Sequence, residues 1–394
     1  MGGSALAMSD APGHPGLSAS AKRPLTVAQV VPALDGGGVE RGTLEVAAAL
    51  ARCGHRSIVI SEGGRLVEPL LEQGSEHVRW ALGRKSPLTL RHIWPLRRWL
   101  KRQRVDILHA RSRMPAWIGY LAWRGMDPAS RPRFITTMHG LHSVNAYSAI
   151  MVRGEAVIAV SKTVREHILQ HYPATDPQRI HLIPRGVDPE AFPRGYQAGP
   201  DWWRQWHATY PQLRGARVLT LPGRITRLKG HDDFIELIAR LREQGREVNG
   251  LIVGGEDPHR RRYARDLRRA AAARAGDRII FTGHRSDIRE VYAASDIILS
   301  LSKRPESFGR TVLEALSMGV PVIGYDHGGV GELLEAMLPE GRVTLGDREA
   351  LTARAAAMLD QRPQVRPNKC FLLSSMLEQT LAIYEQMAQP RSRD

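Results

Sequence analysis

The sequence predicts an α/β protein with two doubly wound, Rossmann-like parallel sheets that face each other across a cleft. Short β-branched or apolar runs alternate with helical patterns, which is typical of parallel sheets covered by helices on both faces. The length of 394 residues leaves room for two or three domains. A stretch rich in proline, glycine and tryptophan, residues 184–215, separates the runs into two series.

Each series of expected strands supplies one sheet. The first series is Thr26–Val31, Ser57–Ile60, Asp106–His109, Phe134–Thr137, Ala156–Val160 and His181–Ile183. The second series is Val218–Leu221, Gly250–Val253, Arg278–Phe281, Ile297–Leu301 and Pro321–Gly324. Ligands of doubly wound sheets bind beyond the carboxyl ends of the strands. The segments that follow these strands are therefore the candidate site.

The composition divides the chain into five expected parts. Residues 1–23, rich in Gly, Ala, Ser and Pro, are expected to be a disordered leader without the apolar core of a signal peptide. An N-terminal Rossmann-like domain is expected over 24–193, a linker over 194–215 and a second Rossmann-like domain over 216–371. The last helical pattern, 372–388, follows a break and is expected to cross back to the first domain.

Two glutamates, Glu306 and Glu314, flank the start of an expected helix near Gly309. The free N–H groups and the positive dipole end of such a helix make a phosphate site. Glu306 precedes the helix and could meet a neutral polyol, whereas Glu314, about two turns in, could accept from a ribose diol. The pattern indicates a nucleotide-sugar pocket, and two solvated glutamates beside an ordinary helix are the alternative.

The segment from Lys303 to Gly319 resembles the E-x7-E signature of the retaining glycosyltransferases of family 4. These enzymes have the two-domain GT-B fold, and the resemblance extends from about Val27 to Met387. It implies that Glu306 contacts hydroxyls of the donor sugar and that Glu314 binds the ribose. It also implies that the segment near the helix start holds the sugar and the diphosphate through Phe308, Gly309, Arg310 and Thr311.

Two cations follow the first strand of the second series. Arg224 comes just after the strand Val218–Leu221 and Lys229 five residues later. Arg224 through its fork and Lys229 as a point charge can neutralise a diphosphate and the charge that grows on it as it leaves. Two exposed basic residues are the plainer alternative. The segment is similar to the family's G-R-x4-K-G motif, and no D-x-D occurs in the chain, so we expect neither a metal nor another cofactor.

A glycine-rich loop with Gly37 and Gly38 follows the first strand and opens a helix. The third glycine of a dinucleotide fingerprint is replaced by Arg41, which weakens a dehydrogenase interpretation. The loop is similar to the family's G-G-x-E-R loop, which faces the donor phosphates and the acceptor; a plain turn is the alternative. Gly283 and Arg285 end another strand, where similar segments bind the nucleotide base, and Arg285 could stack on the base.

His139 follows the strand Phe134–Thr137 at the ligand edge of the sheet. The resemblance implies that a histidine in this loop contacts the donor sugar near its reacting centre, and His142 competes for the assignment. Acceptor-binding candidates are Arg111 and Arg113, which follow the strand Asp106–His109, and Arg185, where many family members have asparagine.

Residues 91–104 form a basic, tryptophan-containing helical pattern, RHIWPLRRWLKRQR. It suggests contact with a membrane surface. A helix with one buried stripe and one solvated arginine face explains it equally well. The formal charge of +16 leaves anionic lipid, phosphorylated glycan and nucleic acid open as partners. No helix-turn-helix, zinc or RNA-recognition signature occurs, so no nucleic-acid partner is expected.

The expected function is retaining, metal-independent transfer of a sugar from a nucleotide-sugar, with a UDP-sugar favoured. The expected acceptor is an anionic, lipid-linked glycan, because the segment His109–Arg113 and the wording SFGRTVLEAL look most like enzymes of lipopolysaccharide-core or surface-glycan synthesis. Two cysteines without metal-binding spacing suggest reduced thiols in the cytoplasm, and we expect peripheral attachment to the inner face of the cytoplasmic membrane. The alternatives are another GT-B enzyme, such as an epimerase or a phosphorylase, and, ranked far lower, a basic nucleic-acid-binding protein.

Overall fold

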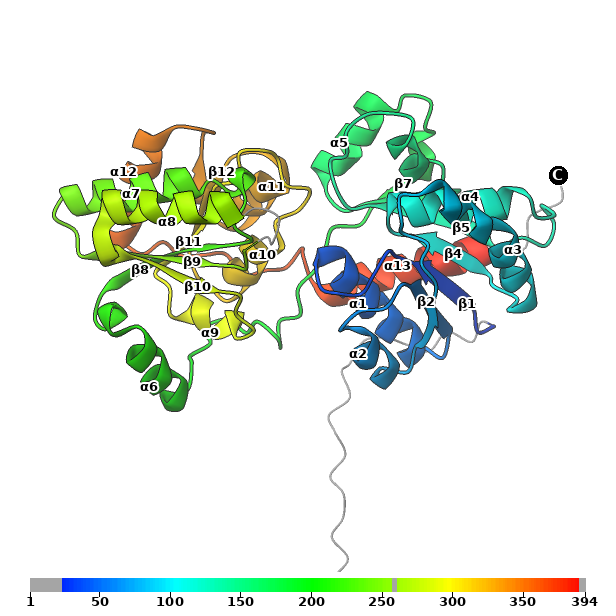
Figure 1. The fold of residues 1–394 in the computed structure, drawn as a ribbon, viewed down its shortest axis with the longest axis horizontal. Helices are drawn as coiled ribbons and strands as arrows, with labels where there is room; N and C mark the ends of the chain where they lie inside the picture. The colour runs from blue at the N-terminus through cyan, green and yellow to red at the C-terminus, as the bar shows by residue number, and fades with distance from the viewer. Residues whose placement is uncertain (1–22, 257–260, 390–394) are drawn as a thin grey trace, which may run out of the picture.

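The computed structural model describes residues 23–256 and 261–389, so the leader expected over residues 1–23 lies outside the described residues apart from Arg23. The chain forms two α/β lobes, one built on β1–β7 and the other on β8–β13 (Figure 1). All strand pairs within both sheets are parallel, which confirms the predicted fold class.

The first lobe contains a seven-stranded sheet in the order β3-β2-β1-β4-β5-β6-β7. Its strands are β1 (Thr26–Val30), β2 (Arg56–Ser61), β3 (Glu76–Arg79), β4 (Ile107–Ala110), β5 (Arg133–Met138), β6 (Ala156–Ala159) and β7 (Ile180–Leu182). Its helices are α1 (Gly38–Arg52), α2 (Val67–Glu72), η1 (Pro87–His92), α3 (Ile93–Arg102), α4 (Arg113–Arg124), η2 (Ser148–Val152), α5 (Lys162–His171) and η3 (Pro177–Arg179).

The second lobe contains a six-stranded sheet in the order β10-β9-β8-β11-β12-β13. Its strands are β8 (Arg217–Pro222), β9 (Val248–Val253), β10 (Ile279–Gly283), β11 (Ile297–Ser300), β12 (Val322–Tyr325) and β13 (Arg342–Val343). Its helices are η5 (Arg227–Lys229), α7 (His231–Glu243), α8 (Arg261–Ala275), η7 (Gly276–Arg278), α9 (Ile288–Ala293), α10 (Arg310–Ser317), α11 (Gly328–Met337), η8 (Pro339–Gly341) and α12 (Arg348–Asp360).

Two strands were missing from the sequence prediction, and both lie at the edge of a sheet. The strand β3 reads Glu-His-Val-Arg and is only partly buried, so it lacks the apolar run that marked the other strands. The strand β13 has two residues, which is too short to leave a pattern. Edge strands contact the core on fewer sides, and their composition is correspondingly weak evidence for a strand.

The order of the strands places a ligand crevice in each sheet. In both sheets the chain starts at a central strand and winds outward in the two directions, so that β1 lies beside β4 and β8 beside β11. The crevice of a doubly wound sheet lies at this switch point, beyond the carboxyl ends of the two strands. The loops that leave these four strands carry Gly37, Arg111, Arg224 and Glu306.

The last helix, α13 (Leu373–Ala388), runs from the second lobe back onto the first, where Figure 1 shows it in red. Its buried side chains pack with those of β1, α1 and β4 in one cluster: Val27, Val46, Leu50, Ile107, Met376, Leu377, Leu381 and Tyr384. The hydroxyl of Tyr384 lies 2.6 Å from His109 Nδ1, and the Thr137 hydroxyl lies 2.6 Å from Nε2 of the same ring. Burial holds the pKa of His109 well below its usual range, so this imidazole is neutral.

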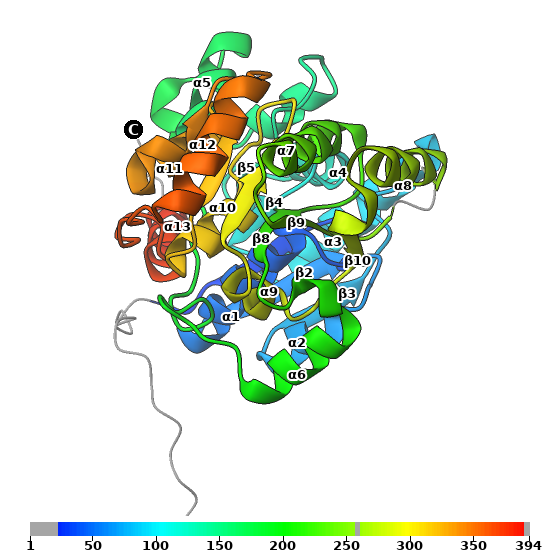
Figure 2. The same cartoon turned by 90° about the vertical axis from the view of Figure 1, so that its left-hand side faces the viewer.

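The segment between the lobes is anchored to the second lobe by α6 (Pro200–Thr209) and the short helix η4 (Pro211–Leu213) that follows it. Trp206 is buried against Val218 and Leu251, and Trp202 Nε1 donates to Asp287 at 2.7 Å. Figure 2, with the second lobe towards the viewer, shows α6 below its sheet. Among the described residues, no helix is long and apolar enough to cross a membrane.

The hydrogen bond between Tyr384 and His109 should stabilise the docking of α13. The substitution Tyr384→Phe leaves a buried imidazole nitrogen without its partner, and we expect the free energy of unfolding to fall by about 1–3 kcal/mol. Urea denaturation followed by circular dichroism measures this change. The matched control is Tyr196→Phe, which removes a bond to Glu290 at a partly exposed site where water can replace it. Equal losses in the two variants would contradict the role given to His109.

Candidate active site

The helix α10 begins at Arg310, and its N-terminus faces the crevice of the second sheet. Gly309 caps the helix with a φ of +98°, and a Cβ at this position would lie 2.9 Å from Val330 Cγ2. Both the backbone conformation and the close approach of α11 therefore require glycine. The predicted helix start is thus observed, with Phe308 buried just before it. Glu314 is the fifth helical residue and lies early in the second turn, close to the expected position about two turns in.

Glu306 and Lys229 form an ion pair at the entrance to this helix. Lys229 Nζ lies 2.7 Å from Glu306 Oε1, and the Ser302 hydroxyl donates to the same oxygen. Burial alone would raise the pKa of Glu306, but the charge and the hydrogen bond of Lys229, with the bond from Ser302, outweigh it and lower the pKa. The carboxylate is therefore ionised and can accept from hydroxyl groups. The sequence suggested both residues but not their contact.

A left-handed glycine fixes Lys229. Gly230 has a φ of +70°, and a Cβ on it would lie 2.0 Å from the backbone oxygen of Leu301. This close approach brings the turn after β8 against the end of β11, which is why a lysine and a glutamate far apart in sequence meet. Arg224 lies in the same turn and is exposed at the end of β8. Its expected role towards a diphosphate stays a prediction.

Glu314 is 3% exposed and sits among polar partners. It accepts from the Tyr292 hydroxyl at 3.1 Å and from Arg310 Nε at 3.2 Å, and Arg41 Nη1 approaches to 4.0 Å. Burial raises the pKa of Glu314, and Arg310 and Tyr292 offset this only in part. Arg310 also pairs with Glu45 of α1, so this cluster spans both lobes.

Among the described residues, further polar contacts join the two lobes around the crevice. Besides Arg310 with Glu45, the Ser307 hydroxyl donates to the backbone oxygen of His139 at 2.7 Å. Another contact is a helix cap made across the lobes. Glu332 of α11 accepts from Lys162 N at 3.0 Å and from Thr163 N at 2.7 Å, at the start of α5. A carboxylate there satisfies free amides and meets the positive end of the helix dipole. Nothing in the sequence indicated these interlobe partners.

His139 accepts a hydrogen bond from Arg185. Arg185 Nη2 lies 2.6 Å from His139 Nδ1 and 3.5 Å from Nε2; because a guanidinium only donates, the closer nitrogen, Nδ1, is taken as the acceptor, which assigns the ring proton to Nε2. Burial, followed by the charges of Arg185 and Arg111, holds the pKa of His139 well below its usual range. The imidazole is thus neutral and carries a single N–H donor. The competing residue, His142, also stays neutral, with burial first and then Arg113 lowering its pKa to about 4.

The guanidinium of Arg185 lies against α1 at Gly42. A Cβ at Gly42 would be 2.3 Å from Arg185 Nη1, so the glycine makes room for the arginine. Burial and the nearby charge of Arg111 lower the pKa of Arg185 to about 9, and it stays protonated at neutral pH. Its observed partner is a side chain of the protein, whereas the sequence led us to expect an acceptor contact.

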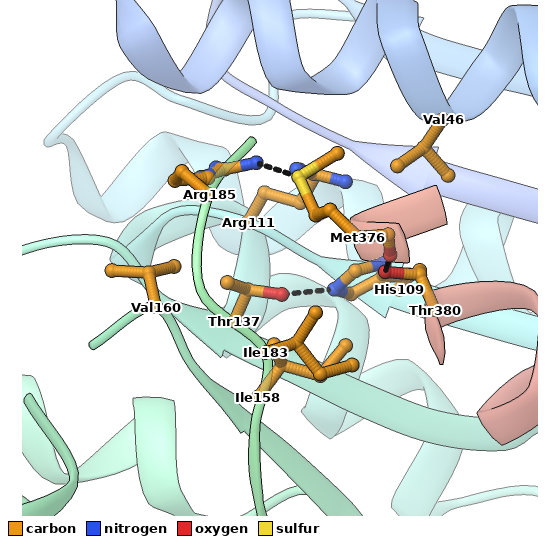
Figure 3. Close-up of a pocket in the computed structure, with 10 residues that line it drawn as sticks. All are labelled: Val46, His109, Arg111, Thr137, Ile158, Val160, Ile183, Arg185, Met376 and Thr380. Carbon is orange, nitrogen blue, oxygen red and sulfur yellow. Dashed lines mark hydrogen bonds between the residues drawn. The ribbon is translucent and has the colours of Figure 1, made fainter. Parts of the chain in front are cut away.

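Arg111, an expected acceptor-binding residue, is buried, and its role towards the acceptor stays a prediction. It is 3% exposed and donates through Nη1 to Gln29 Oε1 at 2.7 Å. It borders a small cavity of about 10 Å³, which Figure 3 shows among Arg111, Arg185, Met376 and the hydrogen-bonded pair His109 and Thr137. That volume fits a single water molecule. The position after β4 was predicted correctly, but sequence spacing does not reveal depth, and here the side chain turns inward under α13.

The remaining candidates lie at the ends of their strands as expected. Arg113 opens α4, donates to the Ser148 hydroxyl at 3.1 Å and stays partly exposed. Gly37 caps α1, and a Cβ at Gly38 would have no neighbour within 4 Å, so the space over this helix start is open. Gly283 ends β10. Arg285 Nε donates to Asp287 at 2.7 Å and its guanidinium lies over Trp206, which holds the side chain towards α6; its stacking on a base stays a prediction.

Comparisons with known proteins agree with this architecture. Residues 36–191 match the family model "Glycosyltransferase Family 4", and residues 205–366 match "Glycosyl transferases group 1". A glycosyltransferase from Rickettsia africae has a similar structure, with a TM-score of 0.82 and 31% identity over 94% of this chain and 100% of that one. The structure of Anabaena HepE in complex with UDP and glucose shares the fold at a TM-score of 0.77, 18% identity and coverage of 92% and 100%.

Two curated relatives are similar over part of their length. A lipopolysaccharide core biosynthesis mannosyltransferase of Rhizobium meliloti is 30% identical over 42% of this chain and 50% of its own. One subunit of the human phosphatidylinositol N-acetylglucosaminyltransferase is 25% identical over 78% of this chain and 62% of its own. The matches to these two and to six further curated relatives cover between 38% and 64% of each relative's own length. With a family model matched on each lobe and the Rickettsia structure matched over its whole length, this chain belongs to glycosyltransferase family 4 and has the GT-B fold.

Proposed function

We propose that this protein is a retaining glycosyltransferase that moves a sugar from a nucleotide-sugar to a glycan acceptor without a metal ion. The observation that carries the proposal is the Lys229–Glu306 ion pair at the N-terminus of α10. There an ionised carboxylate, a cation and free backbone N–H groups converge on one crevice. The carboxylate suits sugar hydroxyls, whereas the cation and the amides suit a diphosphate.

The leaving diphosphate would be stabilised by this protein's own charges. The amides from Phe308 to Thr311, the ammonium of Lys229 and the exposed guanidinium of Arg224 supply positive potential where negative charge grows. Groups held in place before the reaction stabilise such charge with little reorganisation. In this mechanism the departing phosphate takes the proton of the acceptor hydroxyl, on the same face of the sugar from which it leaves, and the anomeric configuration is retained.

Neutral His139 would contact the donor sugar through its Nε2–H group. A neutral donor hydrogen-bonds to a sugar oxygen without adding a cation beside a reacting centre that itself becomes positive. We assign Arg185 the task of holding His139 in this state, because its Nη2 occupies the other ring nitrogen. Arg113, partly exposed at the start of α4, is the remaining candidate for contact with an anionic acceptor.

A UDP-sugar is the favoured donor, and the presence of UDP in the Anabaena neighbour supports this choice. The favoured acceptor is an anionic, lipid-linked glycan of lipopolysaccharide-core or surface-polysaccharide type. The lipopolysaccharide-core relative and the formal charge of +16 support it. Such an acceptor implies work at the inner face of the cytoplasmic membrane, with peripheral attachment through basic residues.

Removing either cation should slow the reaction strongly. We expect Arg224→Ala or Lys229→Ala to lower turnover at least roughly a hundredfold, comparable to the loss of one strong electrostatic donor. Release of UDP from the UDP-sugar that gives the largest thermal shift is the measurement, and Arg227→Ala is the control, since Arg227 is an exposed cation of the same turn. EDTA should change little. Loss of transfer in EDTA and its recovery with a divalent ion would contradict the metal-free account.

The two glutamates should affect different parts of the donor. Glu314→Gln keeps the packing but removes a charged acceptor, and we expect free UDP to bind about tenfold more weakly, as for the loss of a hydrogen bond to a charged group. Glu306→Gln should leave UDP binding unchanged and should weaken binding or transfer of the complete UDP-sugar. Titration calorimetry with UDP and UDP-sugar separates the two effects. Equal losses of UDP affinity in both variants would refute this division.

Arg185 should determine the pH at which kcat/KM falls on acidification. His139 faces Arg185, Arg111, His109 and His142, and burial and these neighbours disfavour its protonation. Removal of one cation in Arg185→Asn raises the pKa of His139, so the neutral form is lost at a higher pH as the solution is acidified. We therefore expect the acid limb of kcat/KM to move to higher pH.

A second substitution displaces Arg185 without deleting it. Gly42→Ala puts a methyl group where Arg185 Nη1 lies, so the acid limb of kcat/KM should again move to higher pH. Alanine has a higher helix propensity than glycine, so weakened helix formation would not explain such a shift. Gly199→Ala, at a glycine whose Cβ would meet nothing within 4 Å, is the control and should leave the profile in place. Nitrogen NMR of His139 reports the tautomer directly. An unchanged tautomer and an unchanged limb in Arg185→Asn would rule out the positioning role.

A further inference from the structure

An apolar groove of about 590 Å³ opens on the first lobe between η1, α4 and the loop that ends at Tyr147. Its walls are formed mainly by apolar and aromatic side chains: Pro87, Leu90, Met114, Trp117, Leu121 and Tyr147. Lys85 and Ser86 complete the lining. The candidate donor residues all lie in other segments, so the groove is separate from the nucleotide-sugar crevice.

The local structure of η1 forces apolar side chains outward beside this groove. Ser86 caps the helix by accepting from Leu88 N, and buried Thr89 donates through its hydroxyl to the backbone oxygen of Arg84. With Thr89 turned inward, Leu88 is 71% exposed and Leu90 48% exposed. Folding thus presents these leucines to the outside of the lobe.

The exposed apolar side chains of the protein concentrate on this side. Seven large apolar residues are exposed in the described part of the chain, and four of them belong to η1, to α3 or to the loop before Tyr147: Leu88, Leu90, Trp94 and Val144. The helix α3 buries Leu96 and Leu100 and leaves Trp94 65% exposed. The helix thus has the buried stripe that one alternative expected, together with an outward tryptophan, and its contact with a membrane stays a prediction. Apolar groups gathered in this way mark a surface for a partner.

The charge of this surface favours an anionic membrane as that partner. Residues 84–104 contain no aspartate or glutamate, and most of their cations are exposed, including Lys85, Arg91, Arg98, Lys101 and Arg102. Cations beside exposed leucine and tryptophan side chains are typical of segments that rest in the interface of an anionic leaflet.

The inner end of the groove reaches the acceptor side of the first sheet. Tyr147 lines the groove, and the guanidinium carbon of Arg113 lies 5.2 Å from the centre of its ring. Arg113 opens α4 just after β4, one of the two strands at the switch point. The apolar path therefore runs from the exposed leucines to a cation beside the crevice.

We propose that this groove binds the alkyl chain of the lipid-linked acceptor, while η1 and α3 rest on an anionic leaflet. The anionic head of the lipid would lie beside Arg113, and its glycan would extend towards the crevice. The proposal rests on the proposed function for the identity of the acceptor. It adds a binding site for the apolar part of that acceptor, whereas the proposed function concerns the sugar and the donor.

Alkyl phosphates of increasing length test the groove without knowledge of the natural acceptor. We expect inorganic phosphate to bind hardly at all and affinity to rise from butyl to decyl phosphate, because each buried methylene contributes a factor of about four. Titration calorimetry measures the affinities, and the change in intrinsic tryptophan fluorescence that is lost in Trp117→Phe is a second readout. Equal affinities for butyl and decyl phosphate would overturn the proposal.

Matched variants separate the groove from unspecific apolar binding. Leu90→Ser should weaken decyl phosphate several-fold, whereas Leu71→Ser should not, since Leu71 is 52% exposed on α2 and lies outside the groove. Arg113→Ala should weaken decyl phosphate but leave uncharged decyl maltoside unchanged. Equal effects of Leu90→Ser and Leu71→Ser would show detergent-like adsorption and would contradict the groove.

Vesicles distinguish the bilayer contact from the chain site. Leu88→Ser and Trp94→Ser should reduce sedimentation with phosphatidylglycerol vesicles at low salt and leave decyl phosphate affinity intact. If the wild-type protein sediments with vesicles but binds butyl and decyl phosphate equally well, this surface contacts a membrane without holding an alkyl chain, and the chain site is refuted. Leu88→Ser and Trp94→Ser should bind UDP with the affinity of the wild-type protein. Failure of the wild-type protein to bind UDP would instead count against the proposed function and leave the groove result standing.

Discussion

The order of the parallel strands is the constraint on which the whole site depends. Both sheets begin at a central strand and wind outward, so β1 pairs with β4 and β8 with β11, and the loops beyond these pairs collect at two crevices. The glycine loop before α1, the turn with Arg224 and Lys229 and the segment before α10 all lie there. Contacts such as Ser307 with His139 then join the two crevices into one site. Residues widely separated in sequence meet because the strand order places the loops that carry them beyond the carboxyl ends of neighbouring strands.

Around this site the charges are balanced unevenly. Glu306 forms an ion pair with Lys229, and Glu314 and Glu45 both pair with Arg310. By contrast, Arg185 hydrogen-bonds to a neutral imidazole and Arg111 to the amide of Gln29. Burial costs these two cations folding free energy, and the nearby carboxylate of Glu45 offsets that cost only in part, so that the pKa values of both remain lowered. We interpret this excess of positive charge as suited to an anionic ligand. After burial, the same two cations also lower the pKa of His139 and so favour its neutral form.

Sequence reasoning located the strands with β-branched runs and the segments that follow them, because alternation and apolar runs report burial directly. The same reasoning missed β3, whose four residues at a sheet edge carry no apolar run. Position along a strand also does not tell depth: Arg111 was expected to bind the acceptor at the ligand edge, and its side chain is buried beside α13. Pairings across the lobes, such as Glu332 with the start of α5, depend on how two rigid bodies dock, and no local pattern encodes that.

The central claim is retaining transfer from a nucleotide-sugar in a site that needs no metal. Proton NMR of the protein with a panel of UDP-, ADP- and GDP-α-sugars in EDTA, with and without a bacterial lipid extract as acceptor, tests it most directly. The account predicts release of the nucleoside diphosphate from one donor and a transferred or released sugar that first appears as the α-anomer. A first product in the β-configuration, or no release from any donor in either condition, would contradict it.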